Sequence, residues 1–347
     1  MLKTLHVENF MAFKKATFEF GALNIIHGDN GAGKTQLLRL AYAMTSIRAP
    51  IPLYDPPDMP VQAWLMMHLN GRLKRIFNVP NRDALIRRGA GSDDNISFGV
   101  TWSDDELLLM WSKNMKNGTF LVTVPKSWAE QRPVFIPPHE YLTYFPGFQS
   151  LSDLGYMPFD ETVSDLCRAL GRPSLPGPTD FNRDAWPWTG LLQEPMEGEL
   201  AIENGQKFVI RTPGGDVDLS LAAEGHRKLA QIAWLIRNGS IGKGVELYWD
   251  EPEANLNPKL IRVAAQLAVD LAKGGVQVFI ATHSVFLMRQ IELLTADLGD
   301  SLAVRHIGLE RSDDGTIVHQ GPNPSDSGPV VALEESVRQS EAYLEID

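Results

Sequence analysis

A glycine-rich segment at residues 28–35 constrains the fold of this chain more than any other feature. It reads Gly-Asp-Asn-Gly-Ala-Gly-Lys-Thr, follows an apolar run at residues 23–27 and precedes a helical pattern at residues 36–41. Its glycines let backbone N–H groups turn toward an anion, and the N-terminus of the following helix carries partial positive charge. This strand–loop–helix setting predicts a phosphate loop that holds a nucleoside triphosphate.

The side chains of the loop predict individual binding roles. Lys34 is expected to reach the β- and γ-phosphates, and the Thr35 hydroxyl is expected to hold Mg²⁺. The other residues predicted to contact the nucleotide are Asp29, Asn30, Gly31, Ala32, Gly33 and Gln36.

Composition places the chain among ordinary globular proteins and predicts a cytoplasmic location. It has 347 residues, of which 44% are hydrophobic and 22% charged. Its apolar runs are too short to cross a bilayer, and its N-terminus lacks the apolar core of a signal peptide. The single cysteine, Cys167, cannot form an internal disulfide, which fits a reducing compartment. We therefore expect no membrane partner.

A net charge of −11 argues against a surface that binds nucleic acid over its whole extent. A basic run at residues 71–89 nevertheless contains Arg72, Arg87 and Arg88. Charge alone leaves three alternatives open for this run: a solvated loop, a face for an acidic protein, or a contact with DNA.

Two further apolar strands end in reactive side chains. The run at residues 245–249 is followed by Asp250 and Glu251, and the run at residues 276–280 leads to Thr282 and His283. After an upstream phosphate loop, Asp250 is expected to hold Mg²⁺ through water and Glu251 to polarise the water that attacks the γ-phosphate. His283 could sense the γ-phosphate and orient that water.

The alternation of strands and helices predicts an α/β fold in three parts. Residues 1–46 and 199–320 form a discontinuous nucleotide-binding core. Residues 47–198 form a mixed α/β insertion, and residues 321–347 end in a C-terminal helix. Within these parts we expect strands at residues 2–10 and 16–26 joined by a turn at 12–15, and mixed strands and short helices between residues 61 and 124. Two turns are expected at Asn117-Gly118 and Asn204-Gly205.

These motifs together resemble the ABC-type ATPases. The resemblance rests on the phosphate loop, Asp250-Glu251-Pro252, residues 253–258 and His283. Within that superfamily the chain is similar to standalone AAA-type ATP-binding proteins, to the ATPase part of OLD-family nucleases, to RecF and to SMC heads. The resemblance implies a P-loop fold with a RecA-like mixed sheet and N-terminal antiparallel strands. It also implies ATP and Mg²⁺ as cofactors and a homodimer with ATP between the two chains.

One motif departs from that pattern. ABC-type ATPases present a Leu-Ser-Gly-Gly-Gln-like signature to the nucleotide of the partner chain, and the corresponding stretch here is residues 222–228. Gly225 is retained and is expected to act in trans, but Ala223 replaces the phosphate-contacting serine. Arg227 or Lys228 could supply the missing positive charge, or could be surface residues of a helix.

The resemblance and the chain's organisation favour a dimerisation switch that is driven by ATP and controls a separately encoded effector. Proteins of this group often accompany nucleases or toxin-like proteins in anti-phage defence. A long coiled coil is excluded by the prolines and the missing heptads between residues 46 and 199, and we expect no room for a nuclease module after residue 319. The alternatives are an ATP-bound scaffold with little turnover and a RecF-like repair ATPase that binds DNA.

Overall fold

The structure is a computed structural model that describes residues 1–48, 60–91, 95–103, 106–112, 129, 131–144, 147, 160–203 and 207–344. A six-stranded sheet forms its centre, and all strands of this sheet run parallel except the edge strand β13. Their order across the sheet is β13 (Gly315–Gly321), β12 (Val304–Ser312), β3 (Leu23–Gly28), β11 (Gln277–Ala281), β10 (Glu246–Asp250) and β6 (Val134–Ile136). This confirms the predicted α/β class with a mixed sheet.

The N-terminal strands belong to a second, antiparallel sheet, as expected. Its order is β2 (Phe13–Glu19), β1 (Leu2–Phe10), β4 (Asn95–Trp102) and β5 (Glu106–Ser112). The prediction of one strand over residues 16–26 was wrong, because β2 and β3 divide it between the two sheets. The chain passes between the sheets at Gly21, where an added Cβ would lie 2.2 Å from the Ala303 carbonyl oxygen. The turn lies at residues 11–12 rather than 12–15, with Met11 at φ 46°.

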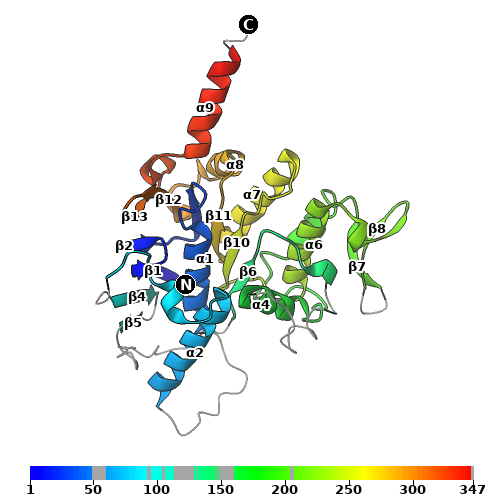
Figure 1. The fold of residues 1–347 in the computed structure, drawn as a ribbon. Helices are drawn as coiled ribbons and strands as arrows, with labels where there is room; N and C mark the ends of the chain where they lie inside the picture. Colours follow the sequence, from blue (N-terminus) through cyan, green and yellow to red (C-terminus); the bar gives the residue numbers. More distant parts are fainter. Residues whose placement is uncertain are drawn as a thin grey trace.

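A third sheet is small and antiparallel, with the order β7 (Glu199–Glu203), β8 (Lys207–Thr212) and β9 (Gly215–Asp218). Figure 1 shows β7 and β8 beyond α6 (Glu224–Arg237), at the side of the molecule. The turns expected at Asn117-Gly118 and Asn204-Gly205 lie outside the described residues.

The central sheet separates two apolar cores, because alternate residues of its strands point to opposite faces. On β11, Val278 and Ile280 pack into one core while Phe279 and Ala281 pack into the other. The first core contains α6, α7 (Pro258–Lys273) and α8 (Val285–Thr295). The second contains α1 (Lys34–Ser46) and the N-terminal sheet, so α1 lies between the two sheets (Figure 1).

The remaining helices include one that the sequence pattern missed. Residues 61–76 form the single helix α2 (Val61–Ile76), not the mixed strands and short helices that we expected. The other helices are α4 (Glu161–Leu170), α5 (Trp188–Leu191) and α9 (Val331–Leu344), with 3-10 turns at Arg82–Leu85, Leu142–Tyr144, Leu219–Leu221, Gly299–Ser301 and Pro324–Ser327. Helix α9 has no buried residue and extends away from the other elements in Figure 1. Every helix of the described part is too short or too polar to span a bilayer.

The segment predicted as an insertion contributes to both large sheets through β4, β5 and β6. It also contains the whole basic run at residues 71–89, in which Arg72 and Arg75 pair with acids of the same chain. Arg72 is only 9% exposed and forms ion pairs with Asp165 at 2.6 Å and with Glu161 at 3.3 Å. Glu161 also forms an ion pair with Arg75 at 3.1 Å. These pairs hold α2 against α4, so they leave fewer charges for an external anion.

Two buried histidines beside the phosphate loop make stability depend on pH. Burial lowers the pKa of His27 and of His306 to about 4, from an ordinary 6.5. Because the folded-state pKa is depressed, the unfolded chain binds more protons, and stability is lost as pH falls from 6.5 toward 4. We expect the free energy of unfolding to drop by about 2 kcal/mol per histidine between pH 7.5 and pH 5.

Urea unfolding of the wild type and of His306→Gln at both pH values measures this effect. The variant should lose about 2 kcal/mol less than the wild type over the same interval. Equal losses in the two proteins would contradict the assignment of His306 as a buried neutral group.

Candidate functional site

The carboxyl ends of three neighbouring strands bring the predicted residues together. Strand β11 pairs in parallel with β3 on one side and with β10 on the other, so Thr282 and His283 lie between the phosphate loop and the paired acids. Backbone hydrogen bonds fix this edge: the Glu251 N–H donates to the Ala281 carbonyl at 2.8 Å, and the Thr282 N–H donates to the Ile26 carbonyl at 2.9 Å.

The phosphate loop needs glycine at two positions for space as well as for conformation. Gly28 has φ 144° and Gly33 has φ 107°, both in the region that disfavours other residues. An added Cβ would lie 2.2 Å from the Leu309 carbonyl oxygen at Gly28, and 2.9 Å from the Phe13 ring at Gly33. The loop is therefore pressed against β12 and β2. Asp29, Asn30 and Gly31 are exposed at its tip, Ala32 and Gly33 are buried, and Gln36 is partly buried on α1.

Lys34 lies inside the loop and is only 7% exposed. Its ammonium donates to the Gly28 carbonyl at 2.8 Å and to the Asp29 carbonyl at 3.1 Å. Burial lowers the pKa of Lys34, and the negative charges of Glu251 and Asp250 partly oppose that shift. The ammonium is thus held where an additional anion would offset the free-energy cost of burying its charge.

Thr35 and Asp250 form the contact between the two halves of the site. The Thr35 hydroxyl lies 3.0 Å and 3.2 Å from the two carboxylate oxygens of Asp250. Asp250 is 3% exposed, and burial, with a contribution from Glu251, raises its pKa to about 6. A buried carboxylate next to a hydroxyl is a set of hard oxygen donors that fits Mg²⁺.

The described residues contain no cluster of three or more His, Cys, Asp or Glu side chains that could hold a metal. Mg²⁺ is typically bound by one or two protein oxygens together with water and phosphate oxygens, so the Thr35–Asp250 pair fits that ion.

Glu251 and His283 face each other beside this pair. Glu251 has a left-handed backbone, φ 46°, and its carboxylate lies 3.4 Å from His283 Nδ1. A glutamate held in that conformation is strained and is found where surrounding structure enforces it. Both side chains remain partly open to solvent, with 31% and 55% exposed. They can therefore reach a water molecule at this edge.

Glu253 is a further candidate site residue. In the sequence it was assigned no role of its own and was included only in residues 253–258, which resemble a loop of the ABC-type ATPases. Its Oε1 accepts from the Thr282 hydroxyl at 2.6 Å and from the His283 N–H at 3.2 Å, and it lies 3.6 Å from His283 Nδ1. Its other oxygen is buried and has no hydrogen-bond partner among the described residues. Glu253 thus fixes the end of β11 and the position of His283; its only signal in the sequence was an acid placed two residues after Glu251.

Gly225 is buried in the first turn of α6. An added Cβ would lie 2.8 Å from Leu260 and 3.2 Å from Leu256, so close packing also requires glycine there. The cationic side chains of Arg227 and Lys228, which follow Gly225, both contact other residues of the chain. Arg227 lies 2.9 Å from Glu140, and Lys228 is 7% exposed and donates to the Ala254 carbonyl.

The raised pKa of Asp250 predicts an effect of Asp250→Asn on stability. The folded pKa lies above the unfolded value of 3.8, so ionisation of this carboxyl destabilises the fold as pH rises from about 4 to 6. We expect the variant without nucleotide to be more stable than the wild type by about 3 kcal/mol at pH 8, and by well under 1 kcal/mol at pH 4. Urea unfolding at the two pH values measures the difference; a variant less stable than the wild type at pH 8 would contradict it.

Comparisons with known proteins agree with this geometry. Residues 4–46 match a family model described as "AAA domain", and residues 165–289 match one described as "AAA domain, putative AbiEii toxin, Type IV TA system". These segments contain the phosphate loop, the paired acids and His283. No curated protein sequence matched the chain.

Solved structures share the fold at low sequence identity. An SMC head bound to the C-terminal winged-helix domain of ScpA is 14% identical with a TM-score of 0.56, over 92% of this chain and 98% of that one. An SMC head with an extended coiled coil from Pyrococcus furiosus is 11% identical with a TM-score of 0.51, over 99% of each chain. The similarity to OLD-family nucleases and RecF remains a prediction. With its phosphate loop, paired acids and sheet order, the chain resembles the standalone AAA/ABC-type ATPases, and it shares the fold of SMC heads.

Proposed function

We propose that the chain hydrolyses ATP and uses the hydrolysis cycle as a dimerisation switch that controls a separately encoded effector. The observation that carries this proposal is the contact of Thr35 with Asp250, at 3.0 Å, with Glu251 and His283 at the same sheet edge. A nucleotide polyphosphate at Lys34 would extend toward these acids.

The residues divide the chemistry between binding and proton transfer. Lys34 and the loop N–H groups hold the polyphosphate, while Thr35 and Asp250 hold Mg²⁺. Mg²⁺, when bound, neutralises charge on the β- and γ-phosphate oxygens. Glu251 polarises the attacking water, and the hydrogen bond from its backbone N–H to the Ala281 carbonyl holds its backbone at the sheet edge.

His283 positions that water from the opposite side. Its backbone is tied to Glu253, and its Nδ1 faces both Glu251 and Glu253 at 3.4 Å and 3.6 Å. From this position the imidazole would hydrogen-bond to the γ-phosphate or hold the Glu251 carboxylate.

A second copy of the chain would complete the site. In this proposal Gly225 faces the γ-phosphate of the partner, in trans, at the N-terminus of α6. Lys228 links this helix to residue 254, close to the catalytic acids, through its hydrogen bond to the Ala254 carbonyl. A rearrangement at Glu251 after hydrolysis could therefore move the Gly225 turn and open the dimer.

The effector is proposed to be a separate nuclease or toxin-like protein in anti-phage defence. Support comes from the matching family description, which names the AbiEii toxin of a type IV system, and from an SMC head solved with a bound domain of another protein. Arg227 and Lys228 already contact other groups of the chain, and Ala223 replaces the serine that contacts phosphate in ABC-type ATPases. These features favour, as a second candidate function, a slow ATPase that acts mainly as an ATP-bound scaffold. The pairing of Arg72 and Arg75 with acids gives less support to RecF-like DNA binding.

The variant Glu251→Gln tests the assignment of the base. It keeps the size of the side chain but is uncharged and cannot accept the proton, so we expect phosphate release to fall by about 10²- to 10⁴-fold. ATP should remain bound, and the dimer should live longer than that of the wild type. Phosphate release, retained nucleotide and light scattering after size exclusion measure these three effects.

The control Lys34→Ala should lose ATP binding and dimerisation together. Hydrolysis by Glu251→Gln at the wild-type rate would exclude Glu251 as the base. A wild type that binds ATP without releasing phosphate would favour the scaffold.

A further inference from the structure

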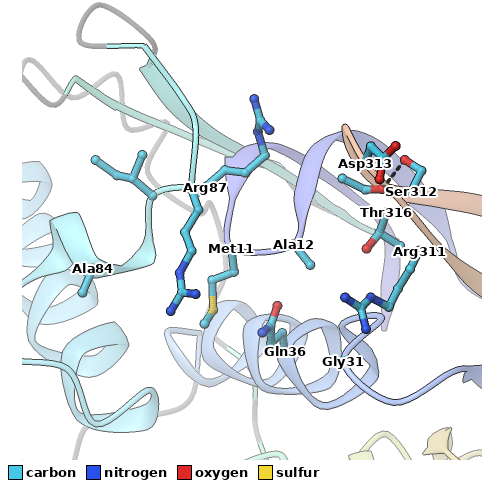
Figure 2. Close-up of a pocket in the computed structure, with 13 residues that line it drawn as sticks. Met11, Ala12, Gly31, Gln36, Ala84, Arg87, Arg311, Ser312, Asp313 and Thr316 are labelled. Atoms are coloured by element: carbon cyan, nitrogen blue, oxygen red, sulfur yellow. Dashed lines mark hydrogen bonds between the residues drawn. The ribbon is translucent and has the colours of Figure 1, made fainter.

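A pocket of about 470 Å³ lies directly beside the phosphate loop (Figure 2). We call it the arginine bowl. Its floor is formed by Gly31 and Gln36, and its walls come from three turns that are distant in sequence: residues 11–12, 84–88 and 311–316. The wall residues with charged side chains are Arg87, Arg88, Arg311 and Asp313.

Hydrogen bonds attach these turns to the loop and to one another. The Thr316 hydroxyl donates to the Ala32 carbonyl at 2.8 Å, and the Thr316 N–H donates to the Ala12 carbonyl at 2.9 Å. On the other wall, the Met11 N–H donates to the Leu85 carbonyl at 2.9 Å. The bowl is therefore built onto the phosphate loop, with both walls held in place.

The position of the bowl identifies which end of a nucleotide would enter it. Asp250, Glu251 and His283 mark the γ-phosphate end of the site, and none of them lines the bowl. Gly31 and Gln36 do line it. A nucleotide with its γ-phosphate toward the acids would thus place its base and ribose toward this side of the loop.

None of the described residues that line the bowl is aromatic, so none of them offers a ring to stack on a base. The ring of Phe13 lies 2.9 Å from the Cβ position of Gly33, but Phe13 is fully buried and edge-on to Phe18. Guanidinium groups take the place of a ring. A guanidinium is planar and stacks on aromatic faces, so it can hold a base as an aromatic side chain does.

Arg311 is the best placed of the three arginines. Its Nη1 lies 3.7 Å from the Cβ position of Gly31, so the guanidinium reaches the loop. Within the described part of the chain it has no hydrogen-bond or ion-pair partner, whereas Arg87 lies 3.8 Å from Asp314. Figure 2 shows Arg311 and Met11 extending toward Gln36 from opposite sides. The Gln36 Oε1 is buried and has no hydrogen-bond partner among the described residues.

We propose that the arginine bowl binds the base and ribose of a purine nucleotide, with Arg311 stacking on the base and Gln36 accepting a hydrogen bond from it. A purine offers the guanidinium a larger face than a pyrimidine does. The β12–β13 hairpin, which carries Arg311, then selects which base the site accepts. This inference rests on the proposed function, because it needs a nucleotide bound at Lys34.

Calorimetric titration with two probes tests the inference: Mg²⁺·ATP, which has a nucleoside, and Mg²⁺·tripolyphosphate, which has none. Arg311→Ala should weaken ATP binding roughly five- to thirtyfold and leave tripolyphosphate binding unchanged. The matched control is Arg305→Ala, which removes an arginine from the same strand that pairs with Glu19 at 3.5 Å, outside the bowl. It should change neither affinity.

Two results would overturn the inference: an equal loss for both probes, which would place Arg311 on the phosphates, or no loss for either. A wild type that binds neither probe would instead overturn the proposed function.

Arg311→Tyr gives an independent readout and covers the case in which the alanine variant does not fold. It supplies a stacking face without charge, so ATP affinity should stay within about threefold of the wild type. A loss of tenfold or more in a folded Arg311→Tyr variant would contradict stacking. With CTP, the wild type should bind more weakly than with ATP or GTP, and equal affinities for the three would contradict the purine assignment.

Discussion

The parallel register of β3, β11 and β10 is the constraint on which the rest of the site depends. Each strand ends at the same sheet edge, and each carries one part of the chemistry: the phosphate loop, the Thr282-His283 pair and the acids at 250 and 251. The hydrogen bond from Thr35 to Asp250 joins residues 215 positions apart. The two cores on either face of the sheet hold these strand ends in place, and Asp250 therefore stays buried despite the cost of its charge.

Local patterns predicted most of the chemistry from the sequence. The phosphate loop and the strands before Asp250 and Thr282 are encoded within a few residues each, and the structure has all of them. Features that depend on distant partners were missed or misassigned. The division of residues 16–26 between two sheets follows from the passage of Gly21 beside Ala303, which no local pattern indicates. Helix α2 was missed because the prediction depended on a regular apolar period, while burial of Arg72 against α4 stabilises part of this helix.

In the candidate site, too, local patterns were predicted from the sequence, whereas contacts between distant residues were missed. Glu253 stood in a recognisable loop, but its bonds to Thr282 and His283 required the pairing of β10 with β11. The arginine bowl could not be predicted, because residues 11, 87 and 311 converge only after both sheets have formed. Arg227 and Lys228 looked like free cations in sequence, but both are bound to neighbours in the fold. In the proposed dimer Lys228 would hold α6 to residue 254, and Arg227 would hold α6 to Glu140.

The central claim is that Mg²⁺ bridges a bound ATP to the Thr35–Asp250 pair. Calorimetric titration of ATP into the wild type and into Asp250→Asn, each with Mg²⁺ and with EDTA, tests this most directly. We expect Mg²⁺ to tighten ATP binding at least tenfold in the wild type, and Asp250→Asn to lose this gain while keeping the affinity measured in EDTA. Equal affinities with and without Mg²⁺ in the wild type, or a full gain from Mg²⁺ in the variant, would contradict it.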